Sequence, residues 1–454
     1  MSSSTTVNPA TGEPLQTYDL LDAEATEAAL DRAASAFARH RQTTFADRAA
    51  KMRRLGDLLE RDKDEHAQLM TREMGKPLAQ AVSEAEKCAW VCRYYAEHAE
   101  AYLADAPRDT EAAKSFVAYE PLGPVLAIMP WNFPYWQVFR FAAPTVMAGG
   151  VGLLKHAKNV LGCGEAIAGL FAEAGFEAVV FQHLPVETDR IEGIIKDRRV
   201  AAVTLTGSEG AGRAVGKAAG EALKPSLLEL GGADAFVVLA DADLDRAVEV
   251  GVQARTQNNG QSCIAAKRFI LESPIAEAFT ERFAERMRDL TVGDPMEDVD
   301  LGPLAREDLR ADVHDQVERA IADGARLVVG GEVPDGPGYY YPPTVLVGVE
   351  EGTVAFEEEV FGPVAALTIA GDEADAVRLA NATRFGLGGS VWTADLERGE
   401  RVAREIRSGA VFVNEMTKSH PHLPFGGVGD SGYGRELGGE GIHAFLNAKT
   451  IWID

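Results

Sequence analysis

The feature that most constrains the fold is an alternation of short apolar runs with longer amphipathic segments. The first series of strand-length apolar runs comprises residues 125–129, 151–155, 178–182 and 200–206. Segments with helical spacing of apolar residues lie between them, such as 165–174 and 211–222. Strands that alternate with helices form a parallel sheet, because a parallel connection needs a crossover segment. A parallel sheet covered by helices is therefore predicted.

A second series of the same kind follows Gly232. Its predicted strands are 235–239, 268–272, 365–369 and 410–414, and its predicted helices are 243–257, 275–290, 307–323 and 396–407. The chain up to Leu103 reads as helices, chiefly 47–72 and 78–103, and residues 115–119 alternate like a strand. A chain of 454 residues is expected to form two or three domains.

The chain is strongly acidic, with a formal net charge of −25. This charge repels duplex nucleic acid and anionic membranes, so neither is an expected partner. No apolar run reaches the ~18 residues that span a bilayer. Residues 1–12 lack the basic and apolar parts of a secretory signal, so the cytosol is the expected compartment. Arginine outnumbers lysine by 32 to 13, which is typical either of a protein from a high-salt cytoplasm or of an ordinary acidic enzyme.

Four cysteines in so long a chain predict no disulfide framework. Cys88 and Cys92 lie four positions apart on one helix face, where we expect small buried hydrophobic residues. A metal site would need two further ligands, and no His or Cys pair with ligand spacing follows. We therefore predict no metal.

Two polar segments follow apolar strands of the first series. Residues 130–134 (PWNFP) hold Asn132 between two prolines, where its amide either donates to an oxyanion or only closes a turn. Residues 206–208 (TGS) end a strand and open a helix, so that Ser208 either binds a phosphate or simply caps the helix. The run 207–212 (GSEGAG) lacks the spacing of a dinucleotide-binding loop.

A carboxylate and a thiol are candidates for the chemistry itself. Glu229 ends an apolar strand, where burial raises the pKa of a carboxyl toward that of a general base; bonds to neighbouring backbone N–H groups are the alternative. Cys263 follows a polar, glycine-containing turn that leaves a thiol accessible. A helix that begins nearby would stabilise its thiolate, whereas a lone cysteine is more often a core residue.

Residues 359–363 (EVFGP) are the last polar segment with a chemical interpretation. Glu359 can accept hydrogen bonds from two vicinal ribose hydroxyls, and Phe361 can pack on a flat ring. The alternative is a solvated acidic turn that leads into a strand.

These five segments, in this order, resemble the aldehyde dehydrogenase superfamily. The resemblance runs from residues 8–12 (NPATG) to the end of the chain, with later landmarks at 341–344 (YPPT), 424–427 (PFGG) and 431–436 (SGYGRE). The 34 positions from Glu229 to Cys263 are also typical of the superfamily. Within it, residues 128–138 (IMPWNFPYWQV) and 154–157 (LKHA) are most similar to bacterial-type succinate-semialdehyde dehydrogenases.

The resemblance implies a function for each segment. Cys263 attacks the aldehyde, Asn132 and the Cys263 N–H hold the oxyanion, and Glu229 activates the water that hydrolyses the thioester. The hydride passes to NADP or NAD. The implied cofactor contacts are Trp131, Lys155, Lys158, Gly207, Ser208, Glu359 and Phe361. Lys158 stands where NAD-selective relatives carry a glutamate, so its charge favours the 2′-phosphate of NADP.

The resemblance also implies a small carboxylate-bearing aldehyde as substrate, with succinate semialdehyde as the first candidate. Arg140 stands where the semialdehyde enzymes place an arginine that reaches the substrate carboxylate, and a pairing with a structural acid is the alternative. Candidates for a second contact are Ser419, Lys418 and His420. Two positions depart from the pattern, because Phe141 replaces a common lysine and Gln257 replaces a second arginine.

The fold implied is aldehyde-dehydrogenase-like α/β, with two doubly wound domains and a small bridging sheet. The predicted parts are a nucleotide-binding domain (1–103 and 122–231), a catalytic domain (232–435) and oligomerisation segments (104–121 and 436–454). An exposed edge strand predicts a homo-oligomer, dimer or tetramer. The alternatives are an aldehyde dehydrogenase of other or broad specificity and a non-catalytic protein on the same fold. Acylating, CoA-dependent relatives normally lack a carboxylate at the position of Glu229.

Overall fold

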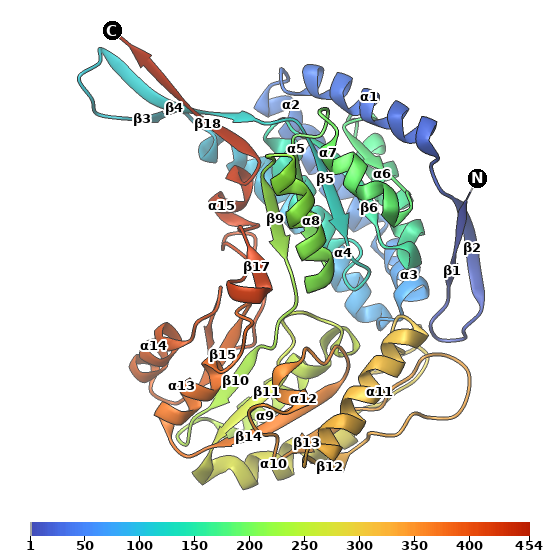
Figure 1. Cartoon of the computed structure of the whole chain (residues 1–454), viewed down its shortest axis with the longest axis vertical. Helices are drawn as coiled ribbons and strands as arrows, with labels where there is room; N and C mark the ends of the chain where they lie inside the picture. The colour runs from blue at the N-terminus through green and yellow to red at the C-terminus, as the bar shows by residue number, and fades with distance from the viewer. Residues whose placement is uncertain (1) are drawn as a thin grey trace.

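The computed structural model describes residues 2–454 and contains two α/β bodies and a projecting small sheet (Figure 1). The strand order of the first large sheet is β17-β9-β8-β5-β6-β7. Its strands are β5 (Pro124–Met129), β6 (Val151–His156), β7 (Phe181–His183), β8 (Ala202–Thr206), β9 (Ser226–Glu229) and β17 (Gly432–Tyr433). The chain runs outward from β5 to β7 and then returns to place β8 on the other side of β5. Open α/β sheets bind ligands at such a switch point, outside the carboxyl ends of the strands.

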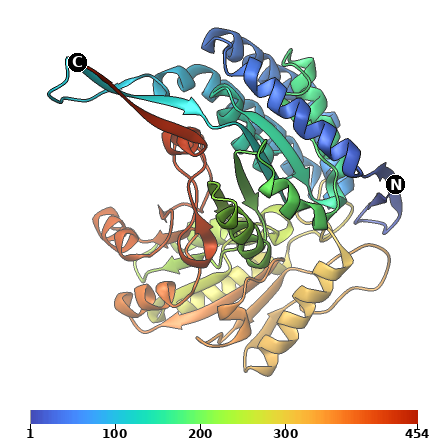
Figure 2. The same cartoon turned by 45° about the horizontal axis from the view of Figure 1, so that its top comes forward.

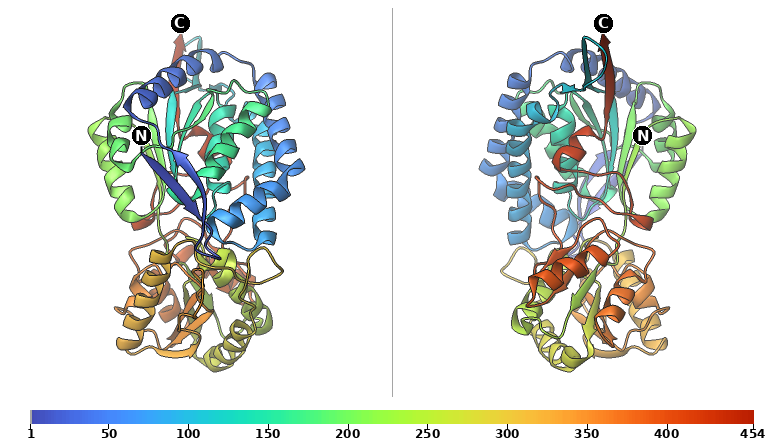
Figure 3. Two further views of the ribbon diagram at one scale, coloured as in Figure 1. Left: turned by 90° about the vertical axis from the view of Figure 1, so that its right-hand side faces the viewer. Right: turned by 90° about the vertical axis from the view of Figure 1, so that its left-hand side faces the viewer.

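Helices cover both faces of this sheet (Figure 3). They are α1 (Ala23–His40), α2 (Phe45–Arg61), α3 (Lys63–Met74), α4 (Leu78–Tyr102), α5 (Trp136–Met147), α6 (Leu161–Glu173), α7 (Ile191–Lys196) and α8 (Glu209–Glu221). Alternate residues of β5 enter different cores, as the period of a strand requires. Ala127 and Met129 pack with α2 to α6, whereas Leu126 and Ile128 pack with α1, α7 and α8.

The second large sheet has the order β12-β13-β14-β11-β10-β15-β16. Its strands are β10 (Ala235–Val238), β11 (Arg268–Glu272), β12 (Arg326–Val329), β13 (Thr344–Val347), β14 (Val364–Ala370), β15 (Gly389–Trp392) and β16 (Phe412–Val413). Its helices are α9 (Leu244–Thr256), α10 (Ser273–Arg288), α11 (Glu307–Ala322), α12 (Val354–Glu357), α13 (Glu373–Asn381) and α14 (Leu396–Glu405). Short 3₁₀ turns are η1 (Lys158–Val160), η2 (Thr188–Arg190), η3 (Gln257–Gly260) and η4 (Gly429–Ser431).

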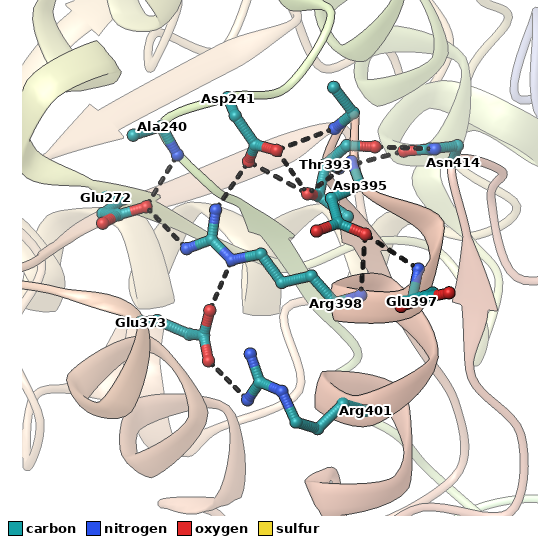
Figure 4. A network of polar contacts seen from close by, with 11 residues as sticks. Ala240, Asp241, Glu272, Glu373, Thr393, Asp395, Glu397, Arg398, Arg401 and Asn414 are labelled. Carbon is teal, nitrogen blue, oxygen red and sulfur yellow. Dashed lines mark hydrogen bonds and ion pairs between the residues drawn. The ribbon is translucent and has the colours of Figure 1, made fainter.

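Arg398 of α14 is the centre of a polar network at the carboxyl edge of this second sheet (Figure 4). Its guanidinium pairs with Asp241 at 2.7 Å and with Glu373, and it lies 3.7 Å from Glu272. Asp241 also accepts a hydrogen bond from the Thr393 hydroxyl at 2.8 Å. The network connects helices to the carboxyl ends of strands. It lies at the edge of the sheet opposite to the one where β10 and β11 begin.

The small sheet projects from the body beside the C-terminus (Figure 2). In it β18 (Leu446–Ile453) and β3 (Ala106–Pro107) both pair antiparallel with β4 (Lys114–Pro121). The segments 104–121 and 436–454 thus contribute the strands of one small sheet. The outer edge of β18 has no neighbouring strand within residues 2–454, and Trp452 and Ile453 on it are half exposed.

Three predictions need correction. Residues read as helical include a hairpin of β1 (Ser3–Val7) and β2 (Pro14–Asp19), whose mostly exposed polar residues give no apolar period. The helix predicted over 47–72 is two helices, because the backbone leaves helical geometry at Asp62. The range 232–435 holds β17, which pairs with β9 of the first sheet. The last helix, α15 (Gly438–His443), leads into β18, and no helix of residues 2–454 is long and apolar enough to cross a membrane.

Candidate active site

The five polar segments meet where the carboxyl edge of the first sheet faces the second body. Strands β5, β6, β8 and β9 are parallel neighbours, so the segments that follow them emerge at one edge. The two segments from the second body join them through glycines. A side chain at Gly231 would collide with the Glu359 carboxylate, and one at Gly260 would collide with the backbone of Gly362. Glycine is required at Gly260 because the two backbones approach so closely there, whereas the contact at Gly231 is with the end of a side chain.

The turn before Cys263 has an unusual backbone. Asn258, Asn259 and Gly260 are consecutive residues with positive φ of 56°, 60° and 74°. Asparagine and glycine are the residues that tolerate this conformation, and such strain often accompanies a functional site. Within residues 2–454 no α-helix begins at Cys263, and the 3₁₀ turn η3 ends three residues before it. The structure therefore offers no helix N-terminus that would stabilise the thiolate.

Cys263 is half buried, whereas Cys88, Cys92 and Cys163 are fully buried. Burial raises the pKa of the Cys263 thiol to about 12, although the positive charges of Arg140 and Lys267 oppose the shift. The thiol is accordingly protonated at neutral pH in the free protein, and a base must take its proton before it can attack.

Asn132 is held in one orientation beside this turn. Its Oδ1 accepts a hydrogen bond from Gln137 Nε2 at 3.1 Å, and its Nδ2 donates to the Gln261 carbonyl at 3.0 Å. Asn258 Nδ2 donates to the Asn132 carbonyl at 2.8 Å, which ties the two segments together. One N–H of the Asn132 amide is left to donate to a further oxygen.

Glu229 is buried at the end of β9, and neither of its carboxyl oxygens has a hydrogen-bond partner within residues 2–454. Burial raises the pKa of Glu229 well above its usual value, and the positive charge of Arg140 opposes this rise. The nearest cation is Arg140, whose Nη2 lies 3.9 Å from Glu229 Oε2. The alternative interpretation, in which backbone N–H groups donate to the Glu229 carboxylate, therefore does not match the structure.

Arg140 lies in a buried ion pair. Its Nε pairs with Glu436, and its Nη2 donates to Thr206 Oγ1 at 3.3 Å. The pairing with an acid that we named as the alternative is thus present, and the contact of Arg140 with a substrate carboxylate stays a prediction. The neighbouring Phe141 is a core residue, packed edge-to-face on Phe445 with ring centroids 6.0 Å apart.

Lys267 is a site residue that we did not predict. Its Nζ donates to the carbonyls of Ser262 and Cys263 at 2.9 and 2.8 Å, and lies 3.4 Å from Glu359 Oε1. The same Glu359 oxygen accepts from the Gly232 N–H at 2.9 Å. The lysine thus joins the nucleophile turn to the segment 359–363. The sequence feature that could have identified Lys267 is its charge directly before the predicted strand 268–272.

The predicted cofactor residues occupy the same edge. Lys155 and Lys158 line a cavity of about 500 Å³, and Lys158 Nζ pairs with Glu187. Ser208 caps α8 by accepting from the Ala211 N–H at 3.4 Å, which leaves its hydroxyl proton available to donate. The Gly207 N–H is used by the Glu229 carbonyl at 3.0 Å, so it is not free for a phosphate.

Two aromatic rings face each other near the nucleophile turn. Trp131 and Phe361 lie edge-to-face with ring centroids 5.8 Å apart. They come from the segments after β5 and before β14, so the two α/β bodies both contribute a flat surface here.

A second cavity, of about 340 Å³, lies beside the nucleophile turn, and its walls include Lys87, Phe133, Trp136, Gln257 and Asn258. Ser419 Oγ accepts hydrogen bonds from Trp136 Nε1 at 3.0 Å and from Lys87 Nζ at 2.9 Å. Of the three candidates for a second substrate contact, Ser419 is thus joined to this wall. Lys418 pairs with Glu415 at 2.9 Å and is half exposed, and His420 packs edge-to-face on Trp90.

Comparisons with known proteins agree with this arrangement. The model of the aldehyde dehydrogenase family matches residues 2–451. A succinate-semialdehyde dehydrogenase (NADP(+)) 1 of Mycobacterium tuberculosis is 52% identical over 452 residues, with 99% of each chain covered. A succinate-semialdehyde dehydrogenase (NADP(+)) of Mycobacterium avium is 51% identical, with 99% of this chain and 96% of that protein covered.

Solved structures give the same result. The crystal structure of succinic semialdehyde dehydrogenase from Streptococcus pyogenes in complex with NADP+ has a TM-score of 0.97 at 36% identity, with 99% of both chains covered. That of succinate-semialdehyde dehydrogenase from Burkholderia pseudomallei has a TM-score of 0.96 at 35% identity, covering 99% of this chain and 94% of the other. The ordered segments, their convergence at one sheet edge and these matches lead to one conclusion, that the chain belongs to the aldehyde dehydrogenase family.

Proposed function

We propose that this aldehyde dehydrogenase oxidises succinate semialdehyde to succinate, with NADP+ as the preferred acceptor over NAD+. The observation that carries the proposal is 51–52% identity, over 99% of the chain, to mycobacterial enzymes named for this substrate and cofactor. The cavity beside the nucleophile turn supports the choice of a carboxylate-bearing substrate. Its walls include the cation Lys87 and Trp136, which donates a hydrogen bond to Ser419.

In the proposed reaction Cys263 is the nucleophile. The thiol first gives its proton to water. The thiolate sulfur then attacks the aldehyde carbon, and the carbonyl oxygen takes up the negative charge of a thiohemiacetal. The remaining N–H of the Asn132 amide and the Cys263 backbone N–H donate to that oxygen. Because Gln137 and Gln261 already fix the Asn132 amide, little reorganisation is needed when the charge develops.

Glu229 is the proposed general base. It removes a proton from the water that attacks the thioester carbon, and the carbon–sulfur bond then breaks to release the acid and regenerate the thiolate. Burial gives its carboxylate a high basicity, because the raised pKa makes it a better proton acceptor once ionised. Only ionised Glu229 can act in this step.

The residues present fit a nicotinamide dinucleotide. The Ser208 hydroxyl and the α8 N-terminus suit a phosphate, Lys155 and Lys158 suit a ribose and its 2′-phosphate, and the Glu359 carboxylate suits vicinal hydroxyls. When bound, the cofactor supplies the hydride acceptor for oxidation of the thiohemiacetal. Trp131 and Phe361 would offer flat surfaces to its ring.

The test is a panel of aldehydes of different length and charge, each assayed with NADP+ and NAD+ by absorbance of the reduced nicotinamide. Succinate semialdehyde with NADP+ is expected to give the highest kcat/KM. Cys263→Ala should reduce turnover to background while cofactor binding persists. A wild type that prefers butanal would overturn the substrate assignment in favour of a general aldehyde-oxidising role.

A homo-oligomer completes the proposal. The free edge of β18 presents unpaired backbone groups and the half-exposed Trp452 and Ile453, and an open edge of this kind tends to pair with another strand. Light scattering coupled to size exclusion should give a dimer or tetramer, and Trp452→Glu should lower its mass. A monomeric wild type would refute this part.

A further inference from the structure

We infer that Lys267 positions the backbone N–H of Cys263 as a donor to the oxyanion, by holding the carbonyl of Ser262 in the same peptide group. The inference rests on the part of the proposed function in which Cys263 attacks an aldehyde, and it applies to any aldehyde. Lys267 is thus a positioning residue, because it acts through the backbone of the nucleophile turn and not on the reacting atoms.

The peptide group between Ser262 and Cys263 carries the argument. It is trans, since residues 2–454 contain no cis peptide bond, and in a planar trans peptide the C=O and the N–H point in opposite directions. Lys267 Nζ donates to the Ser262 carbonyl at 2.9 Å, so the Cys263 N–H points away from the lysine. That N–H donates to no backbone carbonyl within residues 2–454. It therefore stays available for the oxygen of a bound aldehyde.

Lys267 also holds the peptide group on the other side of the nucleophile. Its Nζ donates to the Cys263 carbonyl at 2.8 Å and to the Ala265 carbonyl at 3.3 Å. One ammonium thus fixes both peptide groups that flank the Cα of Cys263, which limits the rotation of the residue that carries the thiol. Hydrogen bonds from a charged donor are stronger than neutral ones and polarise the peptide, so the Cys263 N–H becomes a better donor.

The ammonium is itself held in place. Lys267 is 3% exposed, and its backbone N–H donates to the Asp234 carbonyl at 3.1 Å, where β10 and β11 begin side by side. Glu359 Oε1 lies 3.4 Å from Nζ and supplies the opposing charge. Gly232 leaves room for the arrangement, because a Cβ there would lie 2.8 Å from the Cys263 carbonyl oxygen. A buried ammonium surrounded in this way by acceptors and a counter-charge keeps one position.

A second lysine of the chain provides a matched control. Lys224 Nζ also donates to two backbone carbonyls, that of Ile195 at 2.6 Å and that of Asp197. It stands just before the amino end of β9, at the edge of the first sheet opposite to the site. If such lysines only stabilise the fold by bonding carbonyls, substitution of either one should lower the melting temperature and leave the kinetics unchanged.

The experiment measures the burst of reduced nicotinamide and the steady turnover of Lys267→Met, Lys267→Arg and Lys224→Met. Both tetrahedral intermediates, the thiohemiacetal and the adduct formed by water, place negative charge on the same oxygen. Lys267→Met should therefore slow the burst and the turnover by a similar factor, roughly 10- to 100-fold, with little change in KM for the aldehyde. Lys267→Arg keeps a charged donor and should retain more of both rates. Lys224→Met should retain both in full.

A second measurement does not depend on turnover. The charge of Lys267 opposes the rise in the pKa of the Cys263 thiol, and only the thiolate is alkylated. Loss of that charge should slow the alkylation of Cys263 by iodoacetamide roughly 3- to 10-fold at a given pH. A turn that has merely become loose would expose the thiol and speed the reaction, which would count against the inference.

The outcomes separate this inference from the proposed function. If Lys267→Met and Lys224→Met lower the melting temperature alike and neither slows the burst, Lys267 only stabilises the turn and the inference is wrong. Should Lys267→Met fail to fold, Lys267→Gln, which keeps a donor without the charge, takes its place under the same criteria. A wild type that oxidises other aldehydes but not succinate semialdehyde would refute the proposed substrate. The comparison would still stand, because every aldehyde forms the same oxyanion.

Discussion

Arg140 holds Glu436 in a buried ion pair, and the carboxylate of Glu229 lies on the other side of the same guanidinium, 3.9 Å from its Nη2. One positive charge thus faces two buried carboxyls. Burial raises the pKa of each carboxyl, Arg140 lowers it, and the charge of Glu436 raises that of Glu229 further. The two carboxyls therefore titrate as a pair that retains a proton more readily than either would in water.

This arrangement makes the turnover depend on pH. Because Glu229 must lose its proton to act as a base, kcat should rise with pH through its raised pKa. Glu436→Gln removes one of the two negative charges and leaves Arg140 to Glu229, so the pKa of Glu229 falls and the rise in kcat moves to lower pH. The measurement is kcat against pH for both proteins. A shift to higher pH in the variant would contradict the pairing.

The Cys263 thiol should react slowly with alkylating reagents at neutral pH. Burial raises its pKa to about 12, and only the thiolate reacts. The rate of alkylation by iodoacetamide should increase roughly tenfold per pH unit between about pH 7 and pH 10, without levelling. Peptide mapping should find Cys263 modified and the buried Cys88, Cys92 and Cys163 unmodified. A plateau near pH 8 would show that the thiol is more acidic than its surroundings predict.

Glu229→Gln separates the two halves of the reaction. The amide has nearly the same shape but cannot accept a proton. Pre-steady-state absorbance should show a retained burst of reduced nicotinamide followed by turnover at least about a hundredfold slower than wild type. A variant that slows the burst and the steady state equally would assign Glu229 to an earlier step.

The Lys158–Glu187 ion pair should affect the affinity for NADP+ more than the affinity for NAD+. Glu187 now neutralises the lysine, so a 2′-phosphate must compete with it. Glu187→Gln should tighten NADP+ binding by about two- to fivefold, the range of an exposed ion pair, with little change for NAD+. Lys158→Glu should weaken NADP+ much more than NAD+. Dissociation constants for both cofactors check the pair, and equal effects on the two would refute it.

Much of the site could be predicted because it follows from local patterns. Asn132 and Ser208 follow apolar strands and Glu229 ends one, and parallel strands bring such positions to one edge. The hairpin of β1 and β2 could not be found in this way, because its side chains are mostly exposed and follow no apolar period.

The partners of the charged residues could not be predicted, because they are distant in the sequence. Glu436 meets Arg140, and Ser419 meets Lys87, only through the folded chain. Lys87 itself lies within the polar pattern of an amphipathic helix, where nothing distinguishes it from a solvated lysine. The resemblance to the semialdehyde enzymes predicted a substrate contact for Arg140, but it gave no sign of the ion pair between Arg140 and Glu436.

Substitutions of Arg140 and of Lys87 should change the free energy of unfolding in opposite directions. Arg140→Leu leaves Glu229 and Glu436 buried without a counter-charge, and the free energy of unfolding should fall by about 3 kcal/mol. Lys87→Met removes a charge that burial disfavours, so it should raise the free energy of unfolding. Burial and the charge of Arg140 lower the pKa of Lys87 from 10.5 to about 8, which corresponds to about 1–3 kcal/mol after allowance for partial solvent contact.

The sign of the pH dependence distinguishes this explanation from a change in packing. Between about pH 8 and pH 10.5 the unfolded chain keeps the Lys87 proton that the folded chain has lost, so stability from this group rises with pH in the wild type. The groups that influence this titration are Glu84, Cys88, Arg140 and Lys418. The advantage of Lys87→Met should therefore be greatest below pH 8 and shrink toward pH 10.5. Denaturant titrations of both proteins at several pH values measure it; an advantage that is independent of pH would show that the added stability comes from packing of the methionine and not from the loss of a buried charge.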